Sequence, residues 1–231
     1  MITLEDVGEI TNDLLTERFN LQTAQLERPF PLRPLKMLGL LKFDGWAYTS
    51  EKFLRVLIMK TSLLVRGGCS VFICPHAEYH LPVFTTEVFF FGKKIIFLVD
   101  VQQAFAAGSH SNEWFFDKLL SIREGYKDLL RNPRPVKGKI AELYSPAACY
   151  ATLAKEQANR ALSIYRQYLD AYCDLVASAE PATGYRLSKA RQDLETYIDI
   201  MINHDPAMKM AYLCFGKKGG IQWAMNLFYG R

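Results

Sequence analysis

The sequence predicts an α+β fold in which helices pack against a central, mostly antiparallel β-sheet. Strand-like segments rich in β-branched and aromatic residues are concentrated in the middle of the chain, and helical periodicity dominates before and after them. Half of the 231 residues are hydrophobic, which is enough for a substantial core. No internal repeat or low-complexity tract divides the chain, so we expect a single domain over residues 1–231.

The first expected element is an amphipathic helix over residues 4–19, where apolar side chains recur at helical spacing. The proline-rich stretch 29–34 ends this helix and serves as a linker into the sheet. Strands are expected at residues 37–42, 45–49, 53–57, 70–74, 83–91, 95–101 and 141–151. Helices are expected at residues 113–131, 155–177, 187–202 and 221–228.

Composition excludes several classes of protein. No run of 18 or more apolar residues occurs, so no membrane span is expected. The first six residues are acidic rather than basic, unlike a secretory signal or transit peptide. Five scattered cysteines fit reduced thiols better than a disulfide framework, which predicts a cytoplasmic protein.

The net charge of +4 is unevenly distributed, with basic residues recurring between Arg123 and Lys139 and again at Lys209, Lys217 and Lys218. Such a surface suits an acidic partner or a carboxylated ligand, although solubility alone explains any single residue better. A nucleic-acid footprint would be denser and interleaved with exposed aromatics, so no nucleic-acid partner is expected.

His76 and His80 lie four residues apart and near Cys69 and Cys74, a superficial metal-ligand pattern. Prolines bracket the stretch, and neither a CxxC nor an HExxH motif is present, so no metal site is expected. The chain also lacks GxGxxG, Walker and GxSxG motifs, which weakens the case for a tightly held nucleotide or a serine hydrolase.

Glu87 is the most unusual residue because it lies within an apolar, strand-like run. Residues 82–91 and 95–101 are joined by a short Gly/Lys turn and predict a hairpin. The first strand is apolar on both faces, so both are expected to be covered. Burial would raise the pKa of Glu87 toward neutral pH and make it a proton donor. The alternative, a structural glutamate paired with a lysine or backbone donors, carries about equal weight.

Asp205 is followed by Pro206, a typical helix start with Asp as the N-cap and Pro in the first turn. That structural role is sufficient to explain the residue, although it does not exclude a catalytic one.

The order of several segments resembles that of the ferredoxin-dependent bilin reductases. The matching residues are Phe53-Leu54-Arg55, the cysteine-containing strand before Pro75, Tyr79 to Phe84, Tyr144-Ser145-Pro146, Asp205-Pro206, Lys209, Phe215-Gly216, Trp223-Ala224 and Leu227-Phe228. The resemblance runs from about residue 37 to the end of the chain, at low identity, and rests on order and spacing rather than on one motif.

This resemblance implies a three-layer α/β/α sandwich with a linear tetrapyrrole between the sheet and the C-terminal helices. It implies no bound cofactor, neither metal nor flavin, since electrons arrive singly from reduced ferredoxin, an external [2Fe–2S] protein. The implied partners are ferredoxin, the bilin and a heme oxygenase upstream, and the protein itself is expected to be a monomer. The basic surface would dock acidic ferredoxin and pair with bilin propionates.

The resemblance assigns the central catalytic acid to Glu87 and the second acid to Asp205. The expected substrate-binding residues are Met59, Ser70, His80, Asp100, His204, Lys209 and Met210. The branch that makes phycocyanobilin has a histidine and a glutamate where this chain has Ser70 and Met59, which puts that reduction in doubt. Glu87 also replaces the usual aspartate, as the related red chlorophyll catabolite reductases look to do.

The expected function is therefore ferredoxin-dependent reduction of a linear tetrapyrrole, foremost biliverdin IXα, by radical proton-coupled steps on CH–CH groups. The alternatives are a red chlorophyll catabolite reductase-like enzyme, a non-catalytic bilin-binding carrier and an unrelated α+β binding protein.

Overall fold

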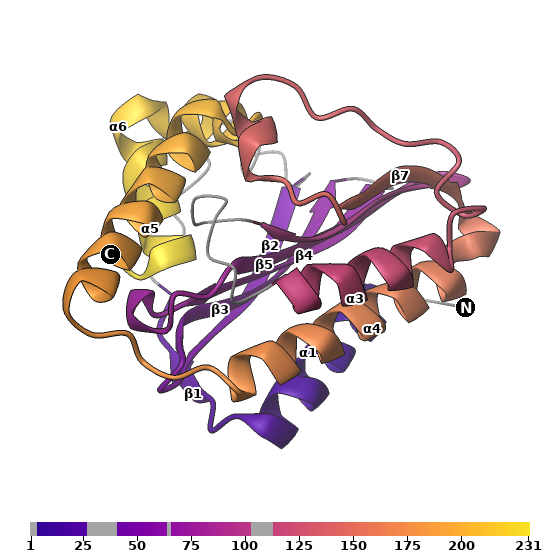
Figure 1. Cartoon of the computed structure of the whole chain (residues 1–231). Coiled ribbons are helices and arrows are strands. Elements are labelled where there is room, and N and C mark those ends of the chain that lie inside the picture. Colours follow the sequence, from indigo (N-terminus) through magenta and orange to yellow (C-terminus); the bar gives the residue numbers. More distant parts are fainter. Residues whose placement is uncertain (1–3, 27–40, 64–65, 103–112) are drawn as a thin grey trace.

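The structure is a computed structural model that describes residues 4–26, 41–63, 66–102 and 113–231. It confirms the α+β class: one sheet lies between two layers of helices, which makes a three-layer α/β/α sandwich (Figure 1).

Within the described ranges, seven strands form one sheet in the order β1-β2-β3-β4-β5-β6-β7. Every neighbouring pair is antiparallel and the strands follow each other in chain order, although α3 and η3 lie between β6 and β7 in the sequence. The strands are β1 (Gln22–Ala24), β2 (Leu41–Thr49), β3 (Phe53–Leu63), β4 (Arg66–Pro75), β5 (Val83–Phe91), β6 (Lys94–Gln102) and β7 (Cys149–Ala154).

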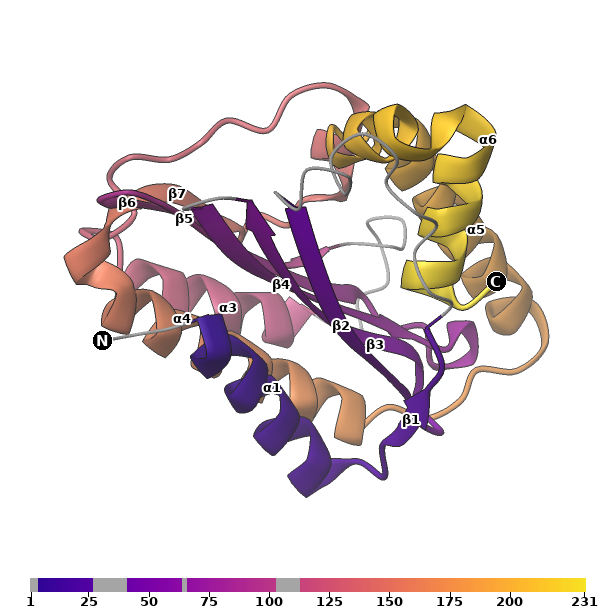
Figure 2. The same ribbon diagram turned by 180° about the vertical axis from the view of Figure 1, so that it is seen from behind.

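Two helical layers cover the two faces of this sheet (Figure 2). One layer consists of α1 (Leu4–Arg18), α3 (Glu113–Glu124) and α4 (Ala158–Ala177), and the other of α5 (Gly184–His204) and α6 (Ala207–Tyr229). Short 3₁₀-helices are η1 (Ala77–Tyr79), η3 (Lys139–Leu143) and η4 (Lys155–Gln157). Each layer has its own hydrophobic cluster against the sheet, as expected for strands that are apolar on both faces.

Buried tyrosines fix α4 in place because their hydroxyls reach partners outside the helix. The Tyr165 hydroxyl lies 2.5 Å from the Thr11 hydroxyl of α1, and Tyr172 donates to the Pro82 carbonyl at 2.9 Å. Both rings are fully buried, so each polar tip is satisfied while the ring contributes apolar area to the core.

The C-terminal end of α4 is capped by Lys52, which lies in the turn between β2 and β3. Its Nζ donates to the carbonyls of Val176, Ala177 and Ala179 at 3.0, 3.0 and 2.9 Å. A cation at this end of a helix satisfies free carbonyls and opposes the negative end of the helix dipole.

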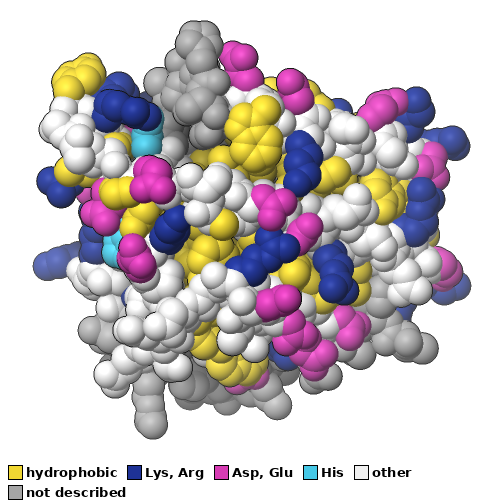
Figure 3. Space-filling view, turned by 60° about the horizontal axis from the view of Figure 1, so that its bottom comes forward, with side chains coloured by type: hydrophobic (Ala, Val, Ile, Leu, Met, Phe, Trp, Pro, Cys, Tyr) yellow, Lys and Arg dark blue, Asp and Glu magenta, His cyan; other side chains and the backbone are white. Residues whose placement is uncertain are grey.

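The surface on the α1, α3 and α4 side carries intermixed charges of both signs (Figure 3). Arg18 of α1 pairs with Asp170 and Asp174 of α4, and Lys118 of α3 reaches Asp174 at 3.2 Å. These exposed pairs link the three helices, and each contributes modestly to stability.

The predicted helix 4–19 is confirmed and ends at Arg18. The hairpin is also confirmed, with β5 and β6 joined through Gly92, whose φ of +59° fits a tight turn. The expected strand 45–49 continues a longer strand that begins at Leu41. The linker at 29–34 and the strand start at 37–40 lie outside the described residues.

The expected strand 141–151 is wrong over its first half. Residues Lys139–Leu143 form a 3₁₀-helix, and the strand begins only at Cys149. Ile140 and Leu143 are buried three residues apart, which is helical rather than strand spacing, and Pro146 separates them from β7. The predicted helix 113–131 likewise ends early, at Glu124, where a glycine follows.

The C-terminal helices are longer than predicted. α5 extends through residues that were expected to be loop, and α6 begins directly after Pro206. Gly216 interrupts α6 with a φ of +72°, which explains why helical periodicity is visible only after it. β1 was not predicted, and β3 and β4 are both longer than expected.

The four described cysteines are free, buried thiols. Among the residues the structure describes, no helix combines the length and apolar character needed to cross a membrane.

Candidate active site

Glu87 lies in the middle of β5, on the face of the sheet that α5 and α6 cover. It stands opposite Ser70 of β4 and Leu98 of β6, and Ser70 stands opposite Met59 of β3. Directly opposite residues on antiparallel strands have their side chains on the same face. Met59, Ser70 and Glu87 therefore form one row across the sheet.

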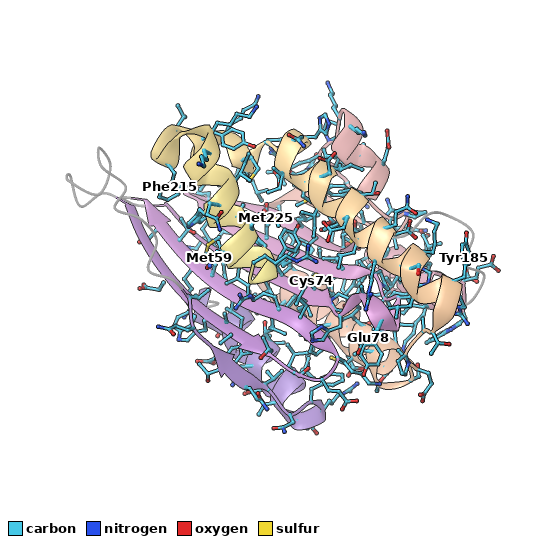
Figure 4. All side chains as sticks on the ribbon, turned by 90° about the vertical axis from the view of Figure 1, so that its left-hand side faces the viewer. Met59, Cys74, Glu78, Tyr185, Phe215 and Met225 are labelled. Atoms are coloured by element: carbon cyan, nitrogen blue, oxygen red, sulfur yellow. The ribbon has the colours of Figure 1, made fainter. Side chains whose placement is uncertain are left out.

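The two neighbours of Glu87 in this row are only partly buried. Figure 4 shows Met59 on the side of the sheet that faces α6, together with Met225 and Phe215 of that helix. These three side chains pack against the hydrophobic cluster on this face and are only partly buried. The row thus presents a sulfur, a hydroxyl and a carboxyl to a partly accessible interior surface.

The Glu87 carboxyl is enclosed by protein, yet part of the side chain remains accessible to solvent. Burial raises its pKa to about 7, and the negative charge of Asp205 acts in the same direction. No described residue donates a hydrogen bond to this carboxyl or forms an ion pair with it. The lysine or backbone partners of a purely structural glutamate are thus not observed, and its proton is available near neutral pH.

Asp205 lies at the junction of α5 and α6, in the layer opposite Glu87. Its Oδ1 accepts a hydrogen bond from the Ala207 N–H at 2.8 Å, which confirms the predicted helix start. Burial raises the pKa of this carboxyl as well, although the bond from Ala207 opposes the shift. The sheet and the helical layer therefore each contribute one acid within electrostatic range of the other.

Asp100 lies on β6, two residues beyond Leu98 and on the same face as Glu87. Its two oxygens accept hydrogen bonds from the Ser145 hydroxyl at 2.5 Å and the Ser145 N–H at 3.1 Å. Burial raises its pKa to about 7 despite these bonds, which favour the ionised form. Asp100 anchors the segment before β7 and is fully buried.

Tyr144 was not selected as a site residue from the sequence. It directly precedes Ser145 and lies half-buried within the cluster on the α5 and α6 side. Burial and the negative charges of Glu87, Asp100 and Asp205 raise its pKa above the ordinary value, so the phenol is neutral. In the sequence, Tyr144 was noted only as the aromatic residue of the Tyr144-Ser145-Pro146 match, and no chemical role was assigned to it.

The other expected site residues are placed as follows. His80 has left-handed backbone dihedrals, and its Nε2 lies 3.8 Å from Asp193 of α5. Burial lowers the pKa of His80 against the effect of that carboxylate. The side chains of His204 and Lys209 are exposed on α5 and α6. Met210 belongs to α6, but its side chain lies outside the described residues.

In the described part of the chain, no group of three or more His, Cys, Asp or Glu side chains is arranged to hold a metal ion. Cys69 and Cys74 belong to the clusters on opposite faces of the sheet, so they do not converge with each other.

The fold and its acids define a class: an α/β/α protein with two buried carboxyls of raised pKa, one on the sheet and one on its C-terminal helical layer. A sequence model described as ferredoxin-dependent bilin reductase matches residues 12–229. The chain belongs to this family, whose members are oxidoreductases that bind a bilin and take electrons from ferredoxin.

The curated relatives include phycoerythrobilin:ferredoxin oxidoreductases. The one from Synechococcus sp. (strain WH8020) is 28% identical over 172 residues, which cover 71% of this chain and 67% of the relative. The one from Prochlorococcus marinus (strain MIT 9215) is 21% identical over 152 residues, covering 63% of this chain and 60% of the relative. The match thus spans less than two thirds of that relative.

Among solved structures, phytochromobilin synthase from tomato, crystallised in complex with biliverdin, matches with a TM-score of 0.81. The sequences are 14% identical, and the match covers 99% of this chain and 83% of the tomato protein. At this identity the comparison establishes the shared fold.

Proposed function

We propose that the protein reduces a linear tetrapyrrole, foremost biliverdin IXα, with single electrons from reduced ferredoxin. The observation that carries the proposal is the pair of acids: Glu87 on the sheet, and Asp205 on the opposing helical layer, whose negative charge raises the pKa of Glu87. A flat, conjugated substrate placed between these layers would meet one proton donor on each side.

Each reduced double bond takes up two electrons and two protons, and a CH–CH bond replaces the C=C bond. Ferredoxin supplies the electrons one at a time, so radical forms of the bilin accept the protons. Glu87 acts as a general acid from the sheet side, since a pKa of about 7 makes proton donation efficient near neutral pH. Asp205 acts from the helical side and directs where the second proton arrives.

The surface around the acids suits such a substrate. It is formed mainly by uncharged side chains that are partly accessible, on the sheet and on α6: Met59, Ser70, Thr85, Met225 and Phe228. An apolar surface with a few convergent polar groups is typical of sites for small molecules and cofactors.

Ferredoxin docking is supported by exposed basic side chains in the segment that leads into η3 and Tyr144. These residues are Arg131, Arg134, Lys137 and Lys139. A basic patch near the site would steer an acidic electron donor toward it and would weaken with added salt.

The test is an anaerobic absorbance assay of the chain with biliverdin, before and after addition of a ferredoxin reducing system. The wild-type protein shifts the biliverdin spectrum on binding and then converts it to a shorter-wavelength product. Glu87→Gln binds biliverdin but stalls with a long-lived radical, with a rate loss of about 10²-fold or more. Glu142→Gln, an exposed change on η3, retains the wild-type rate.

Asp205→Asn separates capping from proton transfer because an amide oxygen still accepts the bond from Ala207. It keeps α6 in place and changes the product or stops the reaction after partial reduction. Normal turnover by Glu87→Gln contradicts the assigned roles. Bound biliverdin that never changes indicates a carrier, and turnover of only a chlorophyll-derived tetrapyrrole indicates the red chlorophyll catabolite reductase type.

A further inference from the structure

The outer side of α6 presents a large apolar side chain to solvent. Leu213 is 79% exposed, whereas Met208 and Ala211 of the same helix are buried in the cluster against the sheet. At 3.6 residues per turn, Leu213 lies on the side of the helix roughly opposite these two residues. Its side chain therefore points away from the core and takes no part in holding α6 to the sheet.

Three exposed lysines flank this leucine along the helix. Lys209 precedes it by one helical turn, and Lys217 and Lys218 follow it directly after the break in the helix. The sequence of α6 contains no aspartate or glutamate. None of the three lysines forms an ion pair with a described residue, whereas Lys118 of the opposite layer is paired with Asp174. The positive charge on this side of α6 is thus not neutralised by described side chains.

The thickness of α6 separates this surface from the candidate site. The inner side of α6 contacts β3 and β4, which carry Met59 and Ser70. Phe215, two residues after Leu213, stacks on Trp223 with the ring centroids 5.4 Å apart, on the side of the molecule where Figure 4 also shows Met59. An α-helix with its side chains is roughly 10 Å across. An electron donor bound to the outside of α6 is therefore brought close to a substrate that lies between α6 and the sheet.

We propose that Lys209, Leu213, Lys217 and Lys218, which we call the α6 patch, form the contact surface for ferredoxin. This inference rests on the proposed function and adds the place where the electron donor binds. The family takes electrons from ferredoxin, an acidic protein whose charge complements these lysines. Burial of the central apolar side chain stabilises such a complex, and the surrounding charges set its orientation and its rate of association.

The basic segment before η3 has a different part in docking. Among residues 131–139, no large apolar side chain is exposed. Arg134 is held against β7, with its guanidinium 5.3 Å from the centroid of the Tyr150 ring. Since η3 contacts α5, which lies in the same layer as α6, this segment extends the positive surface of that layer. It attracts ferredoxin at long range, and the α6 patch makes the contact.

The test measures the binding of an oxidised [2Fe–2S] ferredoxin to the substrate-free protein by calorimetric titration. Leu213→Ser weakens binding about fivefold at low and at physiological ionic strength. Lys217→Glu combined with Lys218→Glu weakens binding about tenfold or more at low ionic strength and less when salt screens the charges. The controls bind as wild type: Tyr185→Ser, at the opposite end of the helical layer from Phe215 (Figure 4), and Lys155→Glu, exposed on η4.

In the biliverdin assay, the variants of the α6 patch raise the KM for ferredoxin. Their kcat at saturating ferredoxin stays within about twofold of wild type, because the residues that meet the substrate are unchanged. Biliverdin binding, followed by the absorbance shift without ferredoxin, is also unchanged. A fall in kcat without a rise in KM contradicts a docking role.

Several outcomes overturn the α6 patch as the docking surface. These are no ferredoxin binding by the wild type, wild-type affinity in both sets of variants, and loss of affinity only when Lys137 and Lys139 are changed to glutamate. Self-association of the wild type that Leu213→Ser abolishes, measured by sedimentation, assigns the patch to a second copy of the chain instead. Ferredoxin binding without bilin reduction by the wild type refutes the proposed function and leaves the docking surface in place.

Discussion

Replacing Glu87 by glutamine is expected to make the folded protein more stable at alkaline pH while removing its activity. The carboxyl ionises near its ordinary pKa of 4.5 in the unfolded chain and at about 7 in the folded protein. Between these values the folded state binds more protons, so the free energy of unfolding of the wild type falls as pH rises. At about 1.4 kcal/mol per pH unit, the difference between these two pKa values corresponds to about 3 kcal/mol of unfolding free energy.

This figure is an upper limit because part of the Glu87 side chain still contacts water. Urea unfolding at pH 5 and pH 8 measures the effect as the difference between Glu87→Gln and wild type. The difference is small at pH 5 and favours the variant by up to about 3 kcal/mol at pH 8. The exposed Glu142→Gln serves as the control, and its stability differs from wild type by a few tenths of a kcal/mol at both pH values.

Asp100, whose pKa is also raised to about 7, is present in both proteins, so its contribution largely cancels in the comparison. A variant that is less stable than wild type at pH 8 would refute the reasoning. That result would mean that the carboxylate is stabilised by a partner in the folded state and that its pKa is not raised by burial.

Two further predictions concern the supports of the site. Ser145→Ala removes the hydroxyl that donates to Asp100 at 2.5 Å. We expect a loss of about 1–3 kcal/mol in unfolding free energy, because the buried Asp100 carboxyl loses a hydrogen-bond partner. Unchanged stability in a denaturant titration would contradict this prediction. Lys52→Met leaves three carbonyls at the end of α4 without their donor, and we expect the free energy of unfolding to fall by about 1–3 kcal/mol. Biliverdin binding should be unchanged, since the site lies on the other face of the sheet. Altered binding would show that the two layers are coupled.

Local sequence patterns were sufficient where an element is determined by its own residues. The hairpin of β5 and β6 was predicted almost to the residue, because two β-rich runs flank a turn whose glycine adopts a positive φ. The start of α6 was equally local, since Asp205 and Pro206 form a helix start on their own. The strand expected at 141–151 was wrong in its first part, where apolar residues pack at 3₁₀-helical spacing, and right only from Cys149. A short apolar run does not distinguish the two structures.

The sequence by itself determined that an acid lies on a buried strand, that a second acid starts the last helix, and that the order of segments matches a reductase family. Only the tertiary structure decided which groups surround Glu87. Strand register places Met59 and Ser70 in its row, and the Asp100–Ser145 bonds tie the segment that contains Tyr144 to β6. These proximities join residues far apart in sequence, and they depend on pairing and packing rather than on local propensity.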